Sequence, residues 1–309
     1  MTTYQELLRD IALTDERVIV MTAENLASIR SIPGAVGNQF IDTGIAEQSL
    51  VGMAAGLALR GRIPVVHALS TFLTMRAFEF IRTDVGIGNL PVKLCGGVAG
   101  FLSEANGPTH QALEDIALMR IIPSMNIFCP SDEQELTLGL RKIVEHPGPF
   151  YIRLNHSKAA VEHSRDFEIG KAEIVFDGDD ITVLVYGTLF AEAVNACRIL
   201  SAGGKSVRLL NMRTVKPIDE EAIIESARRT PLLVTLEDHF ITGGLYSIVC
   251  ETLIKNNVMC KVLPLGLENR WFKPALLPNL LDHEGFTGEK IAEKILKTCH
   301  GGQCYAAYS

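Results

Sequence analysis

Residues 41–61 read IDTGIAEQSLVGMAAGLALRG and carry the strongest structural signal in the chain. The segment predicts a helix that begins at Glu47, continues to Leu59 and is closed by Gly61. A carboxylate at a helix start favours the helix dipole, whereas a buried carboxyl group can donate or accept a proton. These residues alone leave both roles open for Glu47. Small side chains inside the helix permit close approach of a neighbouring backbone: Gly52, Ala54, Ala55 and Gly56.

Apolar β-rich runs alternate with helical segments on both sides of this helix. Strands are predicted at Arg17–Ala23, Ile63–Leu69, Val92–Gly97, Asn126–Pro130 and Phe150–Leu154. Further helices are predicted at Thr71–Val85, Gln111–Arg120 and Asp132–Glu145, the last with a capping-box spacing that starts at Ser131. Strands that are apolar on both faces and separated by helices imply a parallel sheet covered on each side.

The alternation stops at a polar segment and then restarts. Residues 155–170 contain no periodic apolar pattern, and strands and helices resume from Ile181 to the C-terminal region. The 309-residue chain also exceeds the roughly 100–200 residues of one domain. We therefore predict an α/β protein with two doubly wound parallel-sheet domains, residues 1–155 and 171–309, joined by a linker over 156–170.

Composition narrows the class of protein. The net charge is -7 without a run of like charges, which argues against binding to nucleic acid or an anionic membrane. No apolar run approaches the ~20 residues of a membrane span, and the N-terminus lacks a signal region. We expect a cytoplasmic protein with mostly buried, reduced cysteines. The seven cysteines are Cys95, Cys129, Cys197, Cys250, Cys260, Cys299 and Cys304.

Two further segments follow predicted strands, where ligands of doubly wound folds bind. Phe72, Met75 and Phe78 lie at i, i+3 and i+6, so they could form a platform for a flat ring or be part of the core. A Gly-Pro turn brings His110 to the start of the next helix, where its imidazole could bond a substrate oxygen or serve as a cap. His67 could line a channel or lie in its strand, and Arg30 could reach a phosphate or stay exposed in a loop.

Together these motifs resemble the thiamine-diphosphate enzymes of the transketolase type. The resemblance rests on GIAEQ (44–48), STF (70–72), GPTHQALEDIALMR (107–120) and IPSMNIFCPSD (122–132), and continues in LEDHFITGGLYS (236–247). Several independent motifs occur in the family's order. The chain looks like the C-terminal half of a transketolase, with its pyrimidine-binding and C-terminal domains.

The resemblance implies a role for each candidate. Glu47 matches the Glu that bonds the aminopyrimidine ring of thiamine diphosphate, and Phe72, with Met75 and Phe78, matches the face on which that ring stacks. His110 matches the His that binds the substrate oxygen near the cleaved bond. Arg153, in YIRLN, matches the Arg that holds the substrate phosphate, a task that suits a guanidinium fork.

The family's site for the diphosphate and Mg²⁺ is missing from the sequence. That site is a GDG…N motif, and the similar Asp177-Gly178-Asp179 lacks the Asn and reads as a turn. The resemblance therefore implies an N-terminal transketolase subunit that holds diphosphate and metal, in an α2β2 heterotetramer acting on sugar phosphates. The chain alone is expected to be inactive, and we expect no metal ligands in it.

Two positions depart from the family pattern and affect substrate choice. Asn106 stands four residues before His110, where transketolases usually have Asp, and Val98 stands where they usually have a His. The standard pentose phosphates are therefore not assured, and a branched, deoxy or sulfonated analogue stays open. In the C-terminal tail, Cys299-His300 and Cys304 have a metal-like spacing but offer only three ligands.

Other functions compete with the transketolase reading. The β subunit of a 2-oxo acid dehydrogenase has the same layout and the same Glu, but usually a different His motif from GPTHQ. Deoxyxylulose-phosphate synthase has the same GIAEQ motif but is normally one long chain. A non-catalytic regulatory paralogue is the alternative from another class, kept open by Asn106 and Val98.

Overall fold

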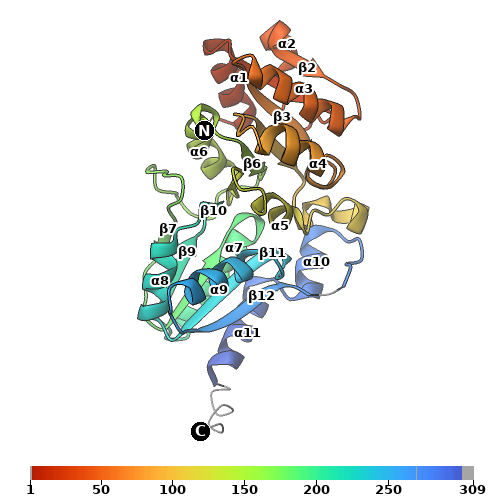
Figure 1. Cartoon of the computed structure of the whole chain (residues 1–309). Coiled ribbons are helices and arrows are strands. Elements are labelled where there is room, and N and C mark those ends of the chain that lie inside the picture. Colours follow the sequence, from red (N-terminus) through yellow and green to blue (C-terminus); the bar gives the residue numbers. More distant parts are fainter. Residues whose placement is uncertain (1, 269, 301–309) are drawn as a thin grey trace.

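A computed structural model describes residues 2–268 and 270–300 of the chain. Two α/β units lie one above the other in Figure 1, the first coloured red to yellow-green and the second green to blue. Each unit has its own sheet with helices on both faces. The predicted α/β class with two sheets is thereby confirmed.

The first sheet has seven strands in the order β10-β5-β6-β4-β3-β1-β2. All neighbours in it are parallel except β10, which pairs antiparallel with β5. The strands are β1 (Val18–Thr22), β2 (Phe40–Asp42), β3 (Ile63–Leu69), β4 (Lys93–Gly97), β5 (Asn126–Phe128), β6 (Phe150–Arg153) and β10 (Thr214–Lys216). Because β10 comes from the second half of the chain, that half contributes an edge strand to the first sheet.

The helices of the first unit include two π-helical and two 3₁₀ segments. The α-helices are α1 (Tyr4–Thr14), α2 (Pro33–Val36), α3 (Glu47–Leu59), α4 (Phe78–Phe80), α5 (Asp115–Arg120) and α6 (Glu133–Glu145). The π-helical segments are η2 (Phe72–Arg76) and η3 (Ile81–Gly86), and the 3₁₀ segments are η1 (Gly37–Gln39) and η4 (Phe101–Thr109).

The second sheet has five strands in the order β12-β11-β8-β9-β7, with only β7 antiparallel to its neighbour. The strands are β7 (Glu173–Phe176), β8 (Ile181–Val185), β9 (Val207–Asn211), β11 (Leu232–Phe240) and β12 (Lys261–Leu267). The helical segments are the 3₁₀ turn η5 (Gly187–Leu189) and the α-helices α7 (Phe190–Ala202), α8 (Glu220–Arg229), α9 (Leu245–Lys255), α10 (Leu277–Glu284) and α11 (Gly288–His300).

The predicted helices and strands agree best with the structure where the apolar pattern of the sequence is strongest. The helix Glu47–Leu59 and the strand Ile63–Leu69 have the predicted bounds. The continuous helix predicted over 71–85 is wrong, because two π-helical segments flank the short helix α4 there. The N-cap of α6 is Asp132 rather than Ser131, since the Asp132 carboxylate accepts from the Glu135 backbone amide.

The predicted linker has neither helix nor strand but is packed against both units. Phe167 is buried and its ring contacts Phe128 at 5.2 Å between centroids. His163, also buried, bonds Asp132 through Nε2 at 2.7 Å and Glu173 through Nδ1 at 2.6 Å. One acid caps α6 and the other begins β7, so the imidazole ties the first unit to the second.

The ion-pair cluster around His163 predicts a pH dependence of stability. Burial opposes the charged imidazole, but the hydrogen bonds to Asp132 and Glu173 outweigh it and raise the pKa of His163 to about 10. Glu135 and Arg213 complete the cluster, with Arg213 paired to Glu135 and Glu173. Between the ordinary histidine pKa and about 10, only the folded state holds this proton. The free energy of unfolding should therefore fall as pH rises through this range.

Urea unfolding at pH 7 and pH 9 checks this expectation. The wild-type chain should lose about 1 kcal/mol per pH unit more than a His163→Gln variant over that interval. Equal losses in the two proteins would mean that His163 is not charged in the folded state.

Two predictions, the absence of a membrane-spanning segment and the burial of most cysteines, can be compared with the structure. In the described part of the chain, every helix is too short or too polar to cross a bilayer. Of the cysteines there, Cys95, Cys129 and Cys197 are buried, Cys250 and Cys260 are half-buried, and Cys299 is exposed. The expectation of mostly buried thiols therefore holds for only half of them, and Cys304 lies outside the described residues.

Candidate active site

The carboxyl ends of β1 and β3 meet the start of α3 around a cavity of about 340 Å³. In a doubly wound sheet this edge is where ligands bind. The cavity is lined by Ala23, Glu24, Asn25, Ile45, Glu47, Leu69 and Phe72. Two of the predicted cofactor-binding residues, Glu47 and Phe72, thus come together on one cavity from segments that are far apart in the sequence.

Glu47 is the first residue of α3, and its side chain is only 3% exposed. The loop before it is held by β2, because the Asp42 carboxylate accepts hydrogen bonds from the backbone amides of Gly44 and Glu24. Gly44 has a positive φ of 66°, a conformation that glycine adopts without steric cost. The hydrogen bonds to Asp42 hold this loop in place. They thereby fix the direction in which α3 starts and the position of the buried Glu47 carboxylate.

Arg76 is a partner of Glu47 that sequence reasoning missed. Its Nη1 donates to both carboxylate oxygens, at 3.1 Å to Oε1 and 2.9 Å to Oε2. Its guanidinium also lies over the Phe72 ring, 4.2 Å from the centroid. Arg76 therefore contacts the two predicted cofactor-binding side chains that line the cavity. No local pattern in the sequence links position 76 to position 47, so only the fold reveals the pair.

His110 lies against the other predicted residues of the site. Its ring is 5.1 Å from that of Phe72 in an edge-to-face arrangement, and its Nδ1 bonds the Thr109 hydroxyl at 2.8 Å. The Thr71 hydroxyl donates to the His110 carbonyl oxygen at 2.7 Å. These bonds connect the turn after β3 to the segment before α5. A row of contacts thus runs from Glu47 through Arg76 to Phe72. The ring of Phe72 in turn contacts His110.

Met75 and Phe78 do not share the position of Phe72. Both are half-buried, neither lines the cavity, and Phe78 packs against the core of the first unit. The π-helical turn Phe72–Arg76 alters the angular spacing on which the predicted shared face depends. Of the three residues, Phe72 therefore lines the cavity, whereas Phe78 packs into the core.

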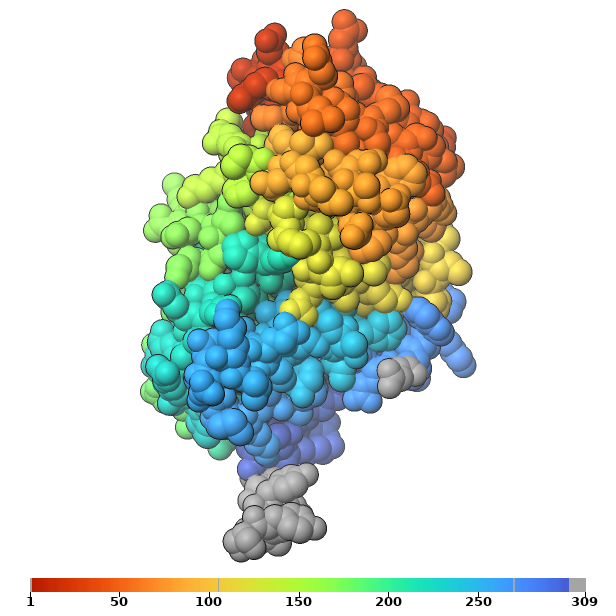
Figure 2. Space-filling view, viewed as in Figure 1, coloured from red at the N-terminus to blue at the C-terminus, as the bar shows by residue number. Residues whose placement is uncertain are grey.

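The segment η4, which carries the substrate-reading candidate Asn106, is supported by the second unit. Asn106 is exposed, whereas Phe101 is fully buried and its ring contacts those of Phe272 and Phe286. In Figure 2 the yellow surface of this region lies between the orange surface of the first unit and the blue surface of the second. Val98, just before η4, has a positive φ of 57°, a strained conformation for a β-branched residue.

His67 lies in the core rather than along a channel. It is 2% exposed, its Nε2 is 2.8 Å from the Tyr4 hydroxyl, and its Nδ1 is 3.2 Å from the Met21 carbonyl oxygen. Burial lowers the pKa of His67 to about 4, so the imidazole stays neutral. Arg30 is exposed in the loop between β1 and α2. The structure thus supports the structural alternative for each of these residues.

Arg153 lies in a buried ion-pair network and does not line the cavity. Its side chain is 4% exposed, its Nε donates to Asp115 at 2.9 Å and its Nη1 donates to Asp238 at 2.7 Å. Both aspartates are fully buried, and Asp238 belongs to β11 of the second unit. The guanidinium is therefore already paired with two buried carboxylates, one from each unit. This pairing leaves it unsuited to hold a substrate phosphate.

The two acids of the Asp177-Gly178-Asp179 turn also form ion pairs with arginines of the chain. Asp177 accepts from Arg208 at 2.6 Å and from Arg229 at 2.8 Å, and Asp179 pairs with Arg229. Both acids are exposed and already neutralised by arginines. In the C-terminal tail, Cys299 is exposed at the end of α11, while the Cys304 of the metal-like spacing lies outside the described residues.

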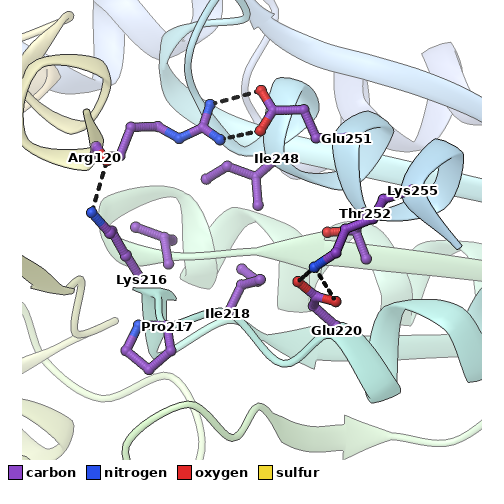
Figure 3. Close-up of a pocket in the computed structure, with 10 residues that line it drawn as sticks. Arg120, Lys216, Pro217, Ile218, Glu220, Ile248, Glu251, Thr252 and Lys255 are labelled. Carbon is purple, nitrogen blue, oxygen red and sulfur yellow. Dashed lines mark hydrogen bonds and ion pairs between the residues drawn. The ribbon is translucent and has the colours of Figure 1, made fainter. Parts of the chain in front are cut away.

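A second cavity, of about 410 Å³, lies between α5, β10 and α9 (Figure 3). Its charged side chains face one another: Arg120 pairs with Glu251, and Lys255 pairs with Glu220 at 3.1 Å. Lys216 donates to the Arg120 carbonyl oxygen at 2.8 Å and so closes the end of α5. The Arg120–Glu251 pair joins α5 of the first unit to α9 of the second, whereas Lys255–Glu220 lies within the second unit. The residues that line this cavity differ from those beside Glu47.

Comparisons with known proteins agree with the fold. Residues 1–161 match the transketolase pyrimidine-binding domain, and residues 170–291 match the transketolase C-terminal domain. A protein of Methanocaldococcus jannaschii named "Putative transketolase C-terminal section" is 36% identical over 300 residues, which cover 95% of this chain and 94% of that protein. The 6-deoxy-6-sulfo-D-fructose transketolase subunit SqwH of Clostridium sp. (strain MSTE9) is 36% identical over 296 residues, covering 94% and 91%.

A solved structure shows the same architecture. It is described as a split gene transketolase, inactive beta4 tetramer, and it superposes with a TM-score of 0.86 at 35% identity. The match covers 95% of this chain and 96% of the other. Fold and matched domains define a protein built from the pyrimidine-binding and C-terminal units of thiamine-dependent transferases. The chain belongs to the transketolase family.

Proposed function

We propose that this chain is the C-terminal subunit of a two-subunit transketolase that transfers a two-carbon ketol unit between sugar phosphates. The observation that carries the proposal is that a buried carboxylate, Glu47, and an aromatic ring, Phe72, line one cavity, with His110 against that ring. The reaction requires thiamine diphosphate, which acts as the electron sink for carbon–carbon cleavage when it is bound.

The cavity suits the aminopyrimidine end of the cofactor. Glu47 supplies a carboxyl group that can share a proton with an accepting ring nitrogen, and Phe72 supplies an apolar ring for stacking. The ring of His110 contacts Phe72, and its Nδ1 is held by the Thr109 hydroxyl, which leaves Nε2 for a substrate oxygen. The charged residues that line this cavity are two glutamates, Glu24 and Glu47, which would repel a diphosphate. This supports a partner subunit that holds the diphosphate and Mg²⁺.

Exposed apolar side chains next to Glu47 support a second subunit at this face. Ile45 is 71% exposed in the loop before α3, and Met53 is 46% exposed on the helix itself. A methyl group added at Gly56, on the same helix, meets no atom within 4 Å. This apolar, unfilled surface fits the close approach of an N-terminal partner, which we place in an α2β2 heterotetramer.

We expect the substrates to be ketose phosphates or their anionic analogues. Asn106 can bond a sugar hydroxyl without adding a negative charge beside it. A relative that carries 6-deoxy-6-sulfo-D-fructose in its name makes a sulfonated ketose a reasonable member of the test panel.

Reconstitution tests the proposed function. We expect no ketol transfer from the chain alone, and turnover once the N-terminal subunit, thiamine diphosphate and Mg²⁺ are added. The panel should include ketose phosphates, a 6-deoxy-6-sulfo ketose and a 2-oxo acid, with transfer measured as a new ketose product. Release of CO₂ from the 2-oxo acid alone would favour the dehydrogenase β subunit, and no turnover on any donor would contradict the proposal.

A further inference from the structure

We infer that Arg76 is a positioning residue that sets Glu47 and Phe72 as one unit for the cofactor ring. The inference rests on the proposed function, because it assigns a role within the same site. Three observations carry it: the contact of Arg76 with the acid, its contact with the ring, and its place outside the cavity.

The contact with the acid uses only part of the carboxylate. A single nitrogen, Nη1, reaches both oxygens of Glu47, and Arg76 is the residue that provides the hydrogen bonds to this buried side chain in the described part of the chain. A carboxylate offers about four lone-pair positions. Glu47 therefore keeps acceptor capacity toward the cavity while Arg76 fixes its orientation from the other side.

The contact with the ring is made by the same guanidinium. Its carbon lies 4.2 Å from the Phe72 centroid, within the range of a cation–π interaction. Both residues belong to the π-helical turn Phe72–Arg76, a rare geometry that occurs frequently at functional sites. One side chain thus connects the two cavity walls, and a shift of either wall costs a contact with Arg76.

Arg76 itself does not line the cavity, and its side chain is 42% exposed. It can therefore act on the cofactor only through Glu47 and Phe72. This distinguishes positioning from direct binding: once Glu47 is replaced, removing Arg76 should have a much smaller effect, because only its contact with Phe72 is left to lose.

A double-mutant cycle in the reconstituted complex tests the inference. Thiamine diphosphate is titrated calorimetrically into the cofactor-free complex with Mg²⁺, using wild type, Arg76→Met, Glu47→Gln and the double variant. Arg76→Met should raise the dissociation constant by about tenfold in the presence of Glu47, and by less than about twofold in the Glu47→Gln background. Arg76→Lys, which keeps the charge, should recover most of the affinity, with little change in KM for the ketose.

Arg82→Met is the matched control. Arg82 is an exposed arginine six positions along the same segment, and its substitution should leave the dissociation constant unchanged. Equal effects of Arg76→Met in both backgrounds, or no effect in either, would overturn the positioning role. If Glu47→Gln itself left both affinity and turnover unchanged, the proposed function would fail, whatever Arg76 does.

Discussion

Replacing Glu47 with alanine in the reconstituted complex is expected to lower kcat for ketol transfer by about a hundred- to ten-thousandfold. We propose the buried carboxyl group of Glu47 as the proton-sharing group, and the other carboxyl group on the cavity, that of Glu24, is exposed. Glu47→Gln keeps a hydrogen-bonding group of the same size but cannot share the proton, so it should lose most of the same activity. Initial rates at saturating donor ketose measure the effect.

The control is Glu145→Ala, which removes an exposed carboxylate from the last turn of α6 and should leave kcat unchanged. Subunit association must be measured for each variant, because Glu47 lies near the face assigned to the partner. Full activity of Glu47→Ala in an assembled complex would mean that this chain contributes no catalysis, as the non-catalytic alternative requires.

Replacing Arg153 with methionine should destabilise the chain by about 3–5 kcal/mol. Asp115 and Asp238 are both fully buried, and each pairs with the same guanidinium, so the variant leaves two carboxylates without their counter-charge. Urea unfolding of the isolated chain measures the loss. If Arg153 held a substrate phosphate instead, the variant would raise KM and leave the free energy of unfolding nearly unchanged.

Two comparisons sharpen this prediction. Arg141→Met, at an exposed position of α6, should change the free energy of unfolding by less than about 0.5 kcal/mol. Adding Asp115→Asn and Asp238→Asn to Arg153→Met should recover part of the lost stability, because the unpaired charges are gone. A loss below about 1 kcal/mol for Arg153→Met alone would contradict a buried ion-pair role.

Local pattern determined how much of the fold could be predicted. The helix Glu47–Leu59 and the strand Ile63–Leu69 were predictable because each is a continuous, mostly apolar run and Gly61 separates the two. The short edge strands β2 and β10 carry too few residues for a periodic signal. The π-helical turn Phe72–Arg76 was not predictable either, since its residues also suit an ordinary α-helix.

The site shows the same division between local and distant information. Glu47, Phe72 and His110 stand out because each follows a strand or begins a helix within a recognisable motif. The pair of Glu47 with Arg76 spans 29 positions and leaves no local mark. The family resemblance predicted a phosphate partner for Arg153, but a guanidinium fork fits phosphate and carboxylate equally well. Only the positions of Asp115 and Asp238 in the fold show which anion it binds.

The central claim is that Glu47 meets the aminopyrimidine ring of thiamine diphosphate in a cavity completed by a second subunit. A crystal structure of the reconstituted complex with cofactor and Mg²⁺ measures this directly. We predict a distance of about 2.6–3.0 Å between a Glu47 carboxylate oxygen and a ring nitrogen of the cofactor. A Glu47 side chain facing bulk water, or a cavity filled by partner side chains so that the ring cannot enter, would contradict it.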